Sequence, residues 1–236
     1  MPHQAKKGGK GPGIVLIQEV FGVNSHIRAV ADQYASDGYT VLAPDIFWRM
    51  QPMVDLGYGP EDLEKGIGYM QKFDFVAGVK DLAASVAALR GLPECTGKVA
   101  SLGYCMGGML SYLCAANAGV DAAVCYYGGG IHTKLEEAGK IKCPVLFHFA
   151  GNDGYIPASA VEAVKPTFTG REGVRVMSIV ICEESDTRIH DAFYGAGAAS
   201  VMPRPVNRDN LVRRVCDLAA GRHPPAVRPA RCRVPV

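Results

Sequence analysis

The sequence predicts a mainly parallel α/β fold in which one central sheet carries helices on both faces. Strand-like apolar segments alternate with helix-like segments, and no internal repeat or low-complexity linker interrupts them. A length of 236 residues suits one such domain with a full core, and an apolar share of 48% is typical of a folded chain. We therefore expect a single domain over residues 1–236, with a basic, glycine-rich lead at 1–13 and an arginine- and proline-rich tail at 222–236.

Each expected element follows from a local pattern. Predominantly apolar runs predict strands at 14–18, 39–43, 98–102, 121–126, 144–150 and 174–181. Apolar residues at helical spacing predict helices at 25–36, from about 60 to 90, and at 106–117, 133–139, 157–165 and 207–219. Ser25 is expected to cap the first helix, and Gly38 to end it. In such a sheet, ligands bind outside the carboxyl ends of the strands.

Composition argues against several classes of protein. No apolar run is long enough to span a membrane, and the lead lacks the apolar segment of a signal peptide, so a cytoplasmic location is expected. The eight cysteines are scattered without a Cys-x-x-Cys pair, which favours reduced thiols and no metal site. Neither a dinucleotide-binding glycine motif nor a Walker loop is present, so no cofactor is expected.

The charge distribution is uneven although the net charge is only +2. Residues 201–236 hold eight arginines against two aspartates. These arginines are interrupted by prolines and lack aromatic neighbours, which favours a solvated tail over a nucleic-acid site. We therefore expect a small molecule as the partner, no nucleic acid or membrane, and a monomer or weak homodimer.

Residues 103–108, Gly-Tyr-Cys-Met-Gly-Gly, carry the most informative motif. They follow the apolar run 98–102 and lead into a helix-like segment. A strand, a tight Gly-x-Cys-x-Gly turn and a helix form the nucleophile elbow of α/β-hydrolases, with Cys105 in place of the usual serine. The helix N-terminus would favour a thiolate, and free N–H groups there would bind an oxyanion. The alternative is a buried cysteine in a glycine-rich turn.

A thiol nucleophile needs a base, and the base needs an orienting acid. The order along an α/β-hydrolase chain is nucleophile, acid, histidine. Asp153 follows the strand 144–150, and His190 lies in the polar loop after the strand 174–181, so both match this order. Taken alone, Asp153 would also suit an ordinary Gly-Asn-Asp-Gly turn.

The other histidines fit the role of base less well. His148 lies within an apolar strand and is expected to be a satisfied core histidine, and His132 precedes Asp153. The remaining ones lie near a helix start or in the terminal segments, at His26, His3 and His223.

Glu19 is a fourth candidate because it follows the first clear strand at the same sheet edge. A carboxylate near a thiol can take its proton or raise its pKa by charge repulsion. The alternative is a surface glutamate that favours the N-terminus of the next helix. The backbone N–H groups of Val20 and Met106 are expected to form the oxyanion hole.

These segments together resemble the dienelactone hydrolase family of the α/β-hydrolase fold. The resemblance covers residues 14 to about 195, and its specific parts are the elbow and residues 18–24, Gln-Glu-Val-Phe-Gly-Val-Asn. Further matches lie at 38–39, 43–45, 73–74, 126–128, 151–153 and 156–157. The resemblance implies Cys105, Asp153 and His190 as a catalytic triad, with Glu19 as the carboxylate that interacts with the thiol.

The chain departs from that family at the substrate. Enzymes acting on dienelactone hold its carboxylate with two arginines, where this chain has Leu63 and Tyr194. Because a bidentate arginine is the usual partner of a carboxylate, a neutral or aromatic substrate is expected. An aromatic pocket is expected to be lined by Phe21, Tyr127, Tyr155, Phe193 and Tyr194. Family members usually begin with an extra strand pair, where this chain has only residues 1–13, so a shortened or exposed sheet edge is expected. The segment before His190 lacks the glycine that often precedes the family's histidine.

The expected activity is hydrolysis of esters or lactones through a thioester acyl-enzyme. One alternative is promiscuous hydrolysis of phosphotriesters or other activated electrophiles. Another, from a different class, is a non-catalytic family member that binds a small apolar ligand. A redox-sensing cysteine ranks last, because no resolving cysteine lies beside Cys105 in the sequence.

Overall fold

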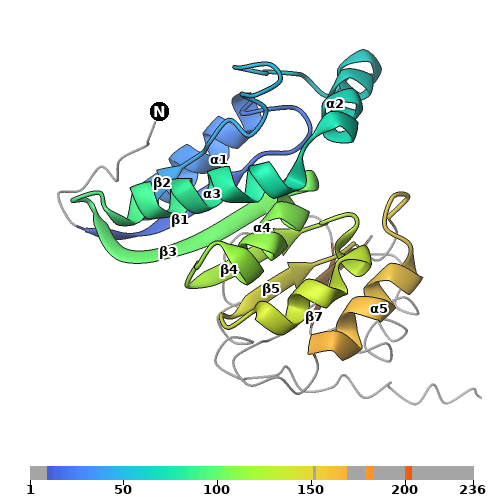
Figure 1. The fold of residues 1–236 in the computed structure, drawn as a ribbon. Coiled ribbons are helices and arrows are strands. Elements are labelled where there is room, and N and C mark those ends of the chain that lie inside the picture. Colours follow the sequence, from blue (N-terminus) through green and yellow to red (C-terminus); the bar gives the residue numbers. More distant parts are fainter. Residues whose placement is uncertain (1–9, 151–152, 169–178, 183–199, 204–236) are drawn as a thin grey trace, which may run out of the picture. The chain divides into compact units, whose positions relative to one another are not determined.

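Five parallel strands form the central sheet of the computed structural model, in the order β2-β1-β3-β4-β5 (Figure 1). The structure describes residues 10–150 and 153–168, together with the strands at 179–182 and 200–203. The sheet strands are Gly11–Ile17 (β1), Thr40–Leu42 (β2), Cys95–Tyr104 (β3), Ala122–Tyr126 (β4) and Val145–His148 (β5). The predicted mainly parallel α/β architecture is confirmed.

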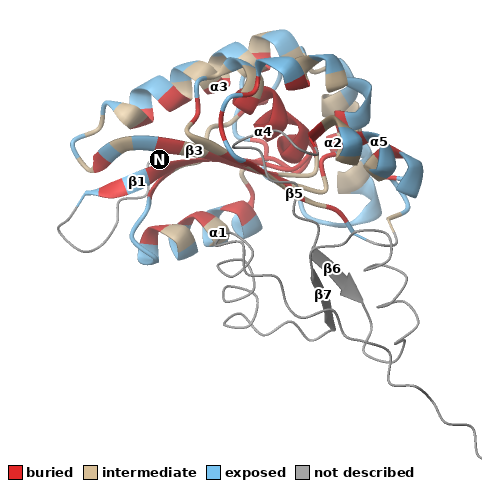
Figure 2. Cartoon of the chain, turned by 90° about the horizontal axis from the view of Figure 1, so that it is seen from below, coloured by how far each residue is buried: buried red, intermediate tan, exposed pale blue. Residues whose placement is uncertain are grey.

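Helices cover both faces of this sheet (Figure 2). Helix α1 (Ser25–Ser36) lies on one face, and α3 (Phe75–Arg90) and α4 (Met106–Asn117) lie on the other. The alternation of side chains along β1 matches these two layers, because Ile14 and Leu16 pack into the α1 cluster while their neighbours pack beneath α3 and α4. Helices α2 (Pro60–Lys72) and α5 (Ala158–Phe168) complete the set of described α-helices.

Three helix predictions need correction. Asn24, not Ser25, caps α1, because its side-chain oxygen accepts a hydrogen bond from Ile27 N at 3.2 Å. The single helical region expected from about 60 to 90 is two helices, and Asp74 caps the second by accepting from the backbone N–H groups of Val76 and Ala77. The helix expected near 133–139 is a pair of 3-10 helices, η1 (Ile131–Thr133) and η2 (Leu135–Lys140).

The N-terminal lead is shorter than expected, because β1 begins at Gly11, which pairs with Cys95 of β3. In this region Gly13 lies opposite Thr40 on β2 and Val99 on β3. Within the described part of the chain, no helix has the length and apolar character needed to cross a membrane.

The chain divides into two compact units, Met1–Val176 and Met177–Val236. In the second unit, β6 (Ile179–Cys182) pairs in parallel with β7 (Ser200–Pro203). Strand β6 overlaps the strand expected at 174–181, whereas β7 was not expected from the sequence. The helix expected at 207–219 and the tail lie outside the described residues, and the single domain over 1–236 stays a prediction.

Candidate active site

Cys105 occupies a strained turn between β3 and α4. Its φ of 55° and ψ of −121° lie where residues other than glycine are rarely found. The turn is pinned from both sides, because Cys105 N donates to Tyr126 O at 3.0 Å and Gly108 N donates to Cys105 O at 2.9 Å. This geometry matches a nucleophile elbow, in which the turn exposes the side chain at the carboxyl edge of the sheet.

The glycines around Cys105 are required by close backbone contacts. A Cβ added at Gly103 would collide with the carbonyl of Gly107, and one added at Gly107 would collide with the carbonyls of Ile17 and Gln18. Helix α4 can therefore lie directly against the end of β1, which brings the residues after β1 to the cysteine. The Gly-x-Cys-x-Gly spacing thus has a packing reason independent of any chemistry.

Backbone donors and carboxylates act on the Cys105 sulfur in opposite directions. Burial makes the largest contribution and raises the pKa of the thiol, and the negative charges of Glu19 and Asp153 raise it further. Hydrogen bonds from the backbone N–H groups of Met106 and Val20 lower it, but the net pKa is raised. The thiolate expected from the helix dipole alone is therefore not favoured in this environment.

Glu19 is buried beside the elbow, with 8% of its surface exposed. The Tyr58 hydroxyl donates to Glu19 Oε2 at 2.7 Å, and the Tyr127 hydroxyl donates to Oε1 at 3.2 Å. The alternative of a surface glutamate near a helix N-terminus is therefore wrong. Tyr58 is a site residue that the sequence analysis missed, because it lies 39 residues from Glu19 in a polar loop without a motif.

Both tyrosines act as neutral donors. Although 58% of Tyr58 is exposed, desolvation of its hydroxyl beside Glu19 is the main reason that its pKa rises to about 12, and the hydrogen bond to Glu19 adds to the rise. Burial and the charge of Glu19 also raise the pKa of Tyr127. Tyr127 has a φ of 39°, and its backbone N donates to His148 O at 2.8 Å. The strand ends of β4 and β5 therefore fix its position.

Asp153 follows β5, as predicted, and its side chain organises a turn. Asp153 Oδ1 accepts hydrogen bonds from Tyr155 N at 2.8 Å and Ile156 N at 3.2 Å. Its charge also contributes to the raised pKa of Cys105. Asp153 can therefore hold this turn and also act as the acid of a triad. His190, which that acid would orient, lies outside the described residues.

The expected aromatic pocket is only partly described. Phe21 is buried and its ring lies 4.6 Å from the ring of Tyr58, measured between centroids. Tyr155 is 82% exposed, so its ring covers little of the site in this conformation. Phe193 and Tyr194 lie outside the described residues. The contact between Phe21 and Tyr58 adds an aromatic residue that the prediction did not include.

His148 differs from its prediction as a satisfied core histidine. Its ring stacks on Tyr126 at 4.3 Å, but its buried Nε2 has no hydrogen-bond partner within the part of the chain that the structure describes. Burial lowers the pKa of His148 to about 4. His26 and His132 are both exposed.

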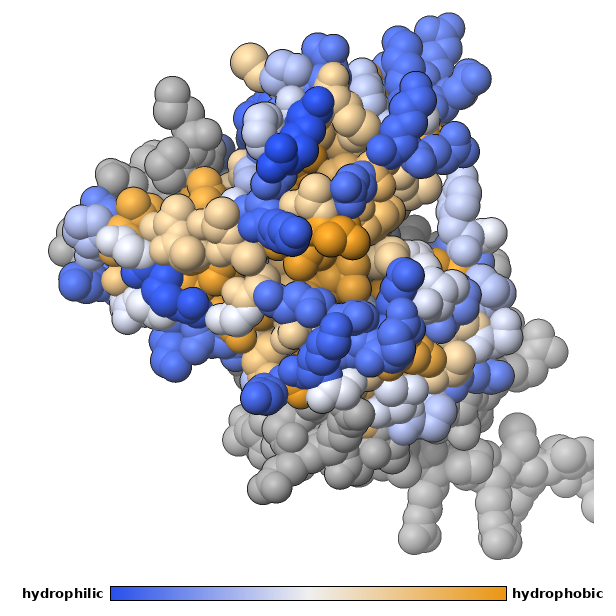
Figure 3. Space-filling model, in the orientation of Figure 1, coloured by the Kyte–Doolittle hydropathy of each residue, from blue (hydrophilic) through white to orange (hydrophobic). Residues whose placement is uncertain are grey.

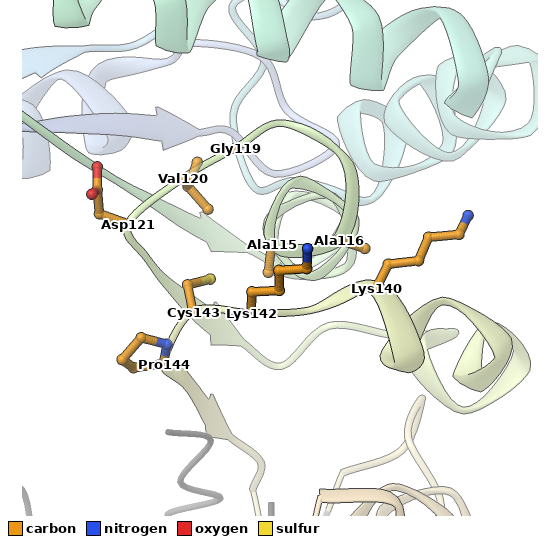
Figure 4. A pocket seen from close by; sticks show the side chains of 9 residues that line it. All are labelled: Ala115, Ala116, Gly119, Val120, Asp121, Lys140, Lys142, Cys143 and Pro144. Atoms are coloured by element: carbon orange, nitrogen blue, oxygen red, sulfur yellow. The ribbon is translucent and has the colours of Figure 1, made fainter. Parts of the chain in front are cut away.

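Two surface hollows lie away from the residues predicted to form the site. One, of about 440 Å³, lies at the amino edge of the sheet, where Asp121 and Cys143 line it (Figure 4). The other, of about 500 Å³, lies between α3, α4 and η2, and Figure 3 shows apolar side chains gathered over α4 on that face. Within residues 10–150 and 153–168, no cluster of three or more histidine, cysteine or acidic side chains is arranged to hold a metal ion.

Known proteins resemble this chain in sequence. The dienelactone hydrolase family model matches residues 2–178. A carboxymethylenebutenolidase from Pseudomonas putida is 36% identical over 193 residues, which cover 80% of this chain and 81% of that protein. Another, from Pseudomonas sp. strain P51, is 36% identical over 169 residues and 70% of each chain is covered.

Solved structures resemble this chain in fold. A dienelactone hydrolase-like promiscuous phosphotriesterase from metagenomic libraries has a TM-score of 0.63 at 24% sequence identity, and 92% of this chain and 89% of that chain are covered. An esterase from Pyrococcus furiosus has a TM-score of 0.52 at 15% identity, with 72% of each chain covered. These likenesses agree with the α/β-hydrolase fold. The match to the family model over residues 2–178 and the 36% identity to the carboxymethylenebutenolidase from Pseudomonas putida show that the chain belongs to the dienelactone hydrolase family.

Proposed function

We propose that this chain hydrolyses carboxylic esters or lactones with Cys105 as the nucleophile. Its family is one of hydrolases, and the observation that carries the finer proposal is the surroundings of Cys105. The cysteine lies in a strained strand-to-helix turn, and the backbone N–H groups of Val20 and Met106 reach its sulfur. A carbonyl attacked by that sulfur would place its oxygen close to the same donors.

The proposed mechanism is acyl transfer in two steps. The Cys105 thiolate attacks the carbonyl carbon, and the N–H groups of Val20 and Met106 stabilise the tetrahedral oxyanion, each by roughly 3 kcal/mol. His190, oriented by Asp153, protonates the leaving alkoxide, which leaves a thioester on Cys105. His190 then activates water, which hydrolyses the thioester and restores the thiol.

The raised pKa of Cys105 makes a base necessary. A thiol whose pKa is raised holds its proton at neutral pH, so its reactivity depends on transfer of that proton when the substrate binds. We assign this transfer to His190, whose ordinary pKa lies near neutrality. Glu19 lies beside the thiol as a second acceptor, but both of its oxygens already accept hydrogen bonds from tyrosines.

Charge at the site favours a neutral substrate. Glu19 and Asp153 act on the Cys105 sulfur as negative charges, and they would also repel a carboxylate that approaches it. The described partners of Glu19 are phenols, which leave its charge in place. With Phe21 and Tyr127 nearby, an uncharged ester with an aromatic group is the proposed substrate class. The small-molecule partner, the monomer or weak homodimer and the cytoplasmic location stay predictions.

A neutral phosphotriester is the second candidate substrate. It satisfies the same charge argument, and the structural relative at a TM-score of 0.63 is described as a promiscuous phosphotriesterase. Attack by Cys105 on phosphorus would then break the bond to the aryloxide, which leaves, and form a phosphorylated thiol in place of a thioester. An assay of aryl acetates, lactones and a neutral aryl phosphotriester in parallel separates the two candidates.

The test compares Cys105→Ala with Cys143→Ala, a matched cysteine at the opposite sheet edge. Cys105→Ala should lower kcat/KM for an aryl acetate by at least about 1,000-fold, because the nucleophile is gone. Cys143→Ala should leave kcat/KM unchanged. Rapid quenching and mass spectrometry should find the acyl group on the peptide that contains Cys105.

Wild-type turnover by Cys105→Ala would contradict this mechanism. Absence of hydrolysis in the wild type, together with a Cys105 that iodoacetamide does not modify, would favour a non-catalytic ligand-binding protein. A His190→Ala variant that kept the pH dependence near neutrality would assign the base to another group.

A further inference from the structure

The Glu19 carboxylate is held by two phenols from different segments of the chain. Tyr58 donates to one oxygen at 2.7 Å and Tyr127 donates to the other at 3.2 Å. A buried carboxylate without donors is costly, and it is commonly paired with a cation. Here the described donors are uncharged, so the carboxylate is satisfied geometrically while its negative charge remains at the site.

Tyr58 is delivered to Glu19 by a loop that is itself fixed. Leu56 N donates to Phe21 O at 2.9 Å, and Asn24 Nδ2 donates to Leu56 O at 3.1 Å. The Tyr58 ring then packs on Phe21, two residues beyond Glu19. The loop before α2 is therefore anchored to the segment after β1 at Leu56, two residues before Tyr58. The surrounding structure therefore holds Tyr58 in contact with Glu19.

We propose that Tyr58 is a positioning residue that acts on Cys105 through Glu19. With Tyr127, it holds the carboxylate in one orientation and weakens the negative potential that the carboxylate exerts on the sulfur. The inference rests on the proposed function for its catalytic meaning, since it takes Cys105 as the nucleophile. The physical effect on the thiol is measurable without any substrate.

Side chains on four of the described segments affect the ionisation of Cys105. Glu19 follows β1 and Asp153 follows β5, and both act on the sulfur as negative charges. Tyr127 follows β4, interacts with Cys105 and keeps its proton because its pKa is raised. Tyr58, on the loop before α2, faces Glu19 and also keeps its proton, since its pKa is about 12. The backbone N–H groups of Val20 and Met106 oppose the carboxylates.

The direction of the effect follows from the phenol dipole. An O–H group that donates to a carboxylate places its positive end against the negative oxygen, which reduces the potential at nearby atoms. Removal of the Tyr58 hydroxyl makes the potential at the Cys105 sulfur more negative. The thiolate becomes less stable, so the thiol ionises at higher pH.

The experiment measures the rate of Cys105 alkylation by iodoacetamide as a function of pH, quantified on the Cys105 peptide by mass spectrometry. Tyr58→Phe keeps the ring on Phe21 and removes only the hydroxyl. Its alkylation midpoint should lie higher than that of the wild type by on the order of half a pH unit. Glu19→Gln should move the midpoint down, because a negative charge is removed.

A double variant separates action through Glu19 from a direct effect. In the Glu19→Gln background, Tyr58→Phe should shift the midpoint far less than it does alone, because the charge on which it acts is absent. Tyr39→Phe is the matched control, since its ring contacts Tyr34 of α1, and it should not move the midpoint. Equal thermal midpoints for Tyr58→Phe and the wild type would show that the fold is retained.

An unchanged or lower midpoint in Tyr58→Phe would overturn the inference, as would an equal shift in the two backgrounds. The proposed function fails on a different result, namely full hydrolysis by Cys105→Ala. Intact hydrolysis through Cys105 with no shift in Tyr58→Phe would therefore reject the role of Tyr58 alone.

Discussion

The two edges of the five-stranded sheet each bring a cysteine near an aspartate, but the two pairs have different surroundings. At the carboxyl edge, Cys105 receives hydrogen bonds from two backbone N–H groups of other residues and is affected by Asp153. At the amino edge, Cys143 is buried beside Asp121, and the described backbone donor to its sulfur is its own N–H (Figure 4). Burial is the main cause of a raised pKa at both thiols.

The two aspartates differ in the partners that compensate their negative charge. Asp121 accepts hydrogen bonds from Lys98 Nζ at 2.8 Å, Arg90 at 2.9 Å and Val99 N at 3.0 Å, and these partners lower its pKa to about 2. The described partners of Asp153 are backbone N–H groups. The amino edge therefore uses its acid to join strands and helices, whereas the carboxyl edge keeps negative charge near a strained thiol. Residue type alone does not distinguish them.

Among the changes that test this comparison of the two acids, the largest expected effect comes from neutralising the acid at the carboxyl edge. Asp153→Asn keeps an oxygen that can accept from Tyr155 N and Ile156 N, so the turn should persist. It removes the charge that would orient and stabilise a protonated His190, so kcat/KM for an aryl ester should fall by at least about 100-fold.

Asp121→Asn is the control at the amino edge and should leave kcat/KM unchanged. If Asp153→Asn kept wild-type turnover with an unchanged thermal midpoint, Asp153 would be a turn residue only. Both aspartates would then have a structural role alone, and the two edges would differ in the role of their cysteines.

The next largest effect is on the free energy of unfolding, through the close packing at the nucleophile elbow. Gly107→Ala would place a Cβ against the carbonyls of Ile17 and Gln18, so either β1 or α4 must shift. We expect a loss of about 3 kcal/mol in the free energy of unfolding, measured by urea titration. Gly139→Ala, in η2, meets no atom within 4 Å and should change stability by less than about 0.5 kcal/mol. Equal stability of the two variants would contradict the close packing at the elbow.

The smallest effect is the pH dependence contributed by Asp121. Its folded pKa of about 2 lies below the ordinary value of 3.8, so its contribution is present above pH 4 and is lost as the pH falls towards 2. Asp121→Asn should therefore lower the free energy of unfolding at pH 7 by about 1 kcal/mol, a value discounted for solvent screening of partly exposed pairs.

At pH 3 the difference between Asp121→Asn and the wild type should be smaller than at pH 7. Urea titrations at the two pH values measure it. A difference that grew as the pH fell would reverse the sign assigned to Asp121.

Local patterns predicted most of the described fold. The strands of the sheet, α1 and α4 follow from apolar runs, helical periodicity and the Gly-x-Cys-x-Gly turn, all of which involve neighbouring residues. The wrong predictions lie where a helix cap or an interruption between two helices decides between similar interpretations of the sequence. Asn24 and Ser25 are both good caps, and only the hydrogen bond to Ile27 N selects Asn24. Asp74 ends one helical stretch and begins another, which periodicity alone did not reveal.

The candidate site was predicted less completely than the fold. The sequence offered Glu19, Cys105 and Asp153 as candidate site residues because each follows a strand, and parallel strands bring such residues to one edge. It could not identify Tyr58, because the loop that carries it has no periodic pattern and reaches Glu19 only through contacts with residues 21–24. The position of His190 relative to these residues stays a prediction.

The sequence by itself determined the order of the elements and the turn that holds Cys105, because apolar periodicity and the need for glycine are local properties. Tertiary structure decided how the thiol ionises and what holds Glu19. Burial, the charges after β1 and β5, and two phenols separated from Glu19 by 39 and 108 residues act across space. Electrostatic and desolvation energies depend on distance and packing, so they exist only once the chain has folded.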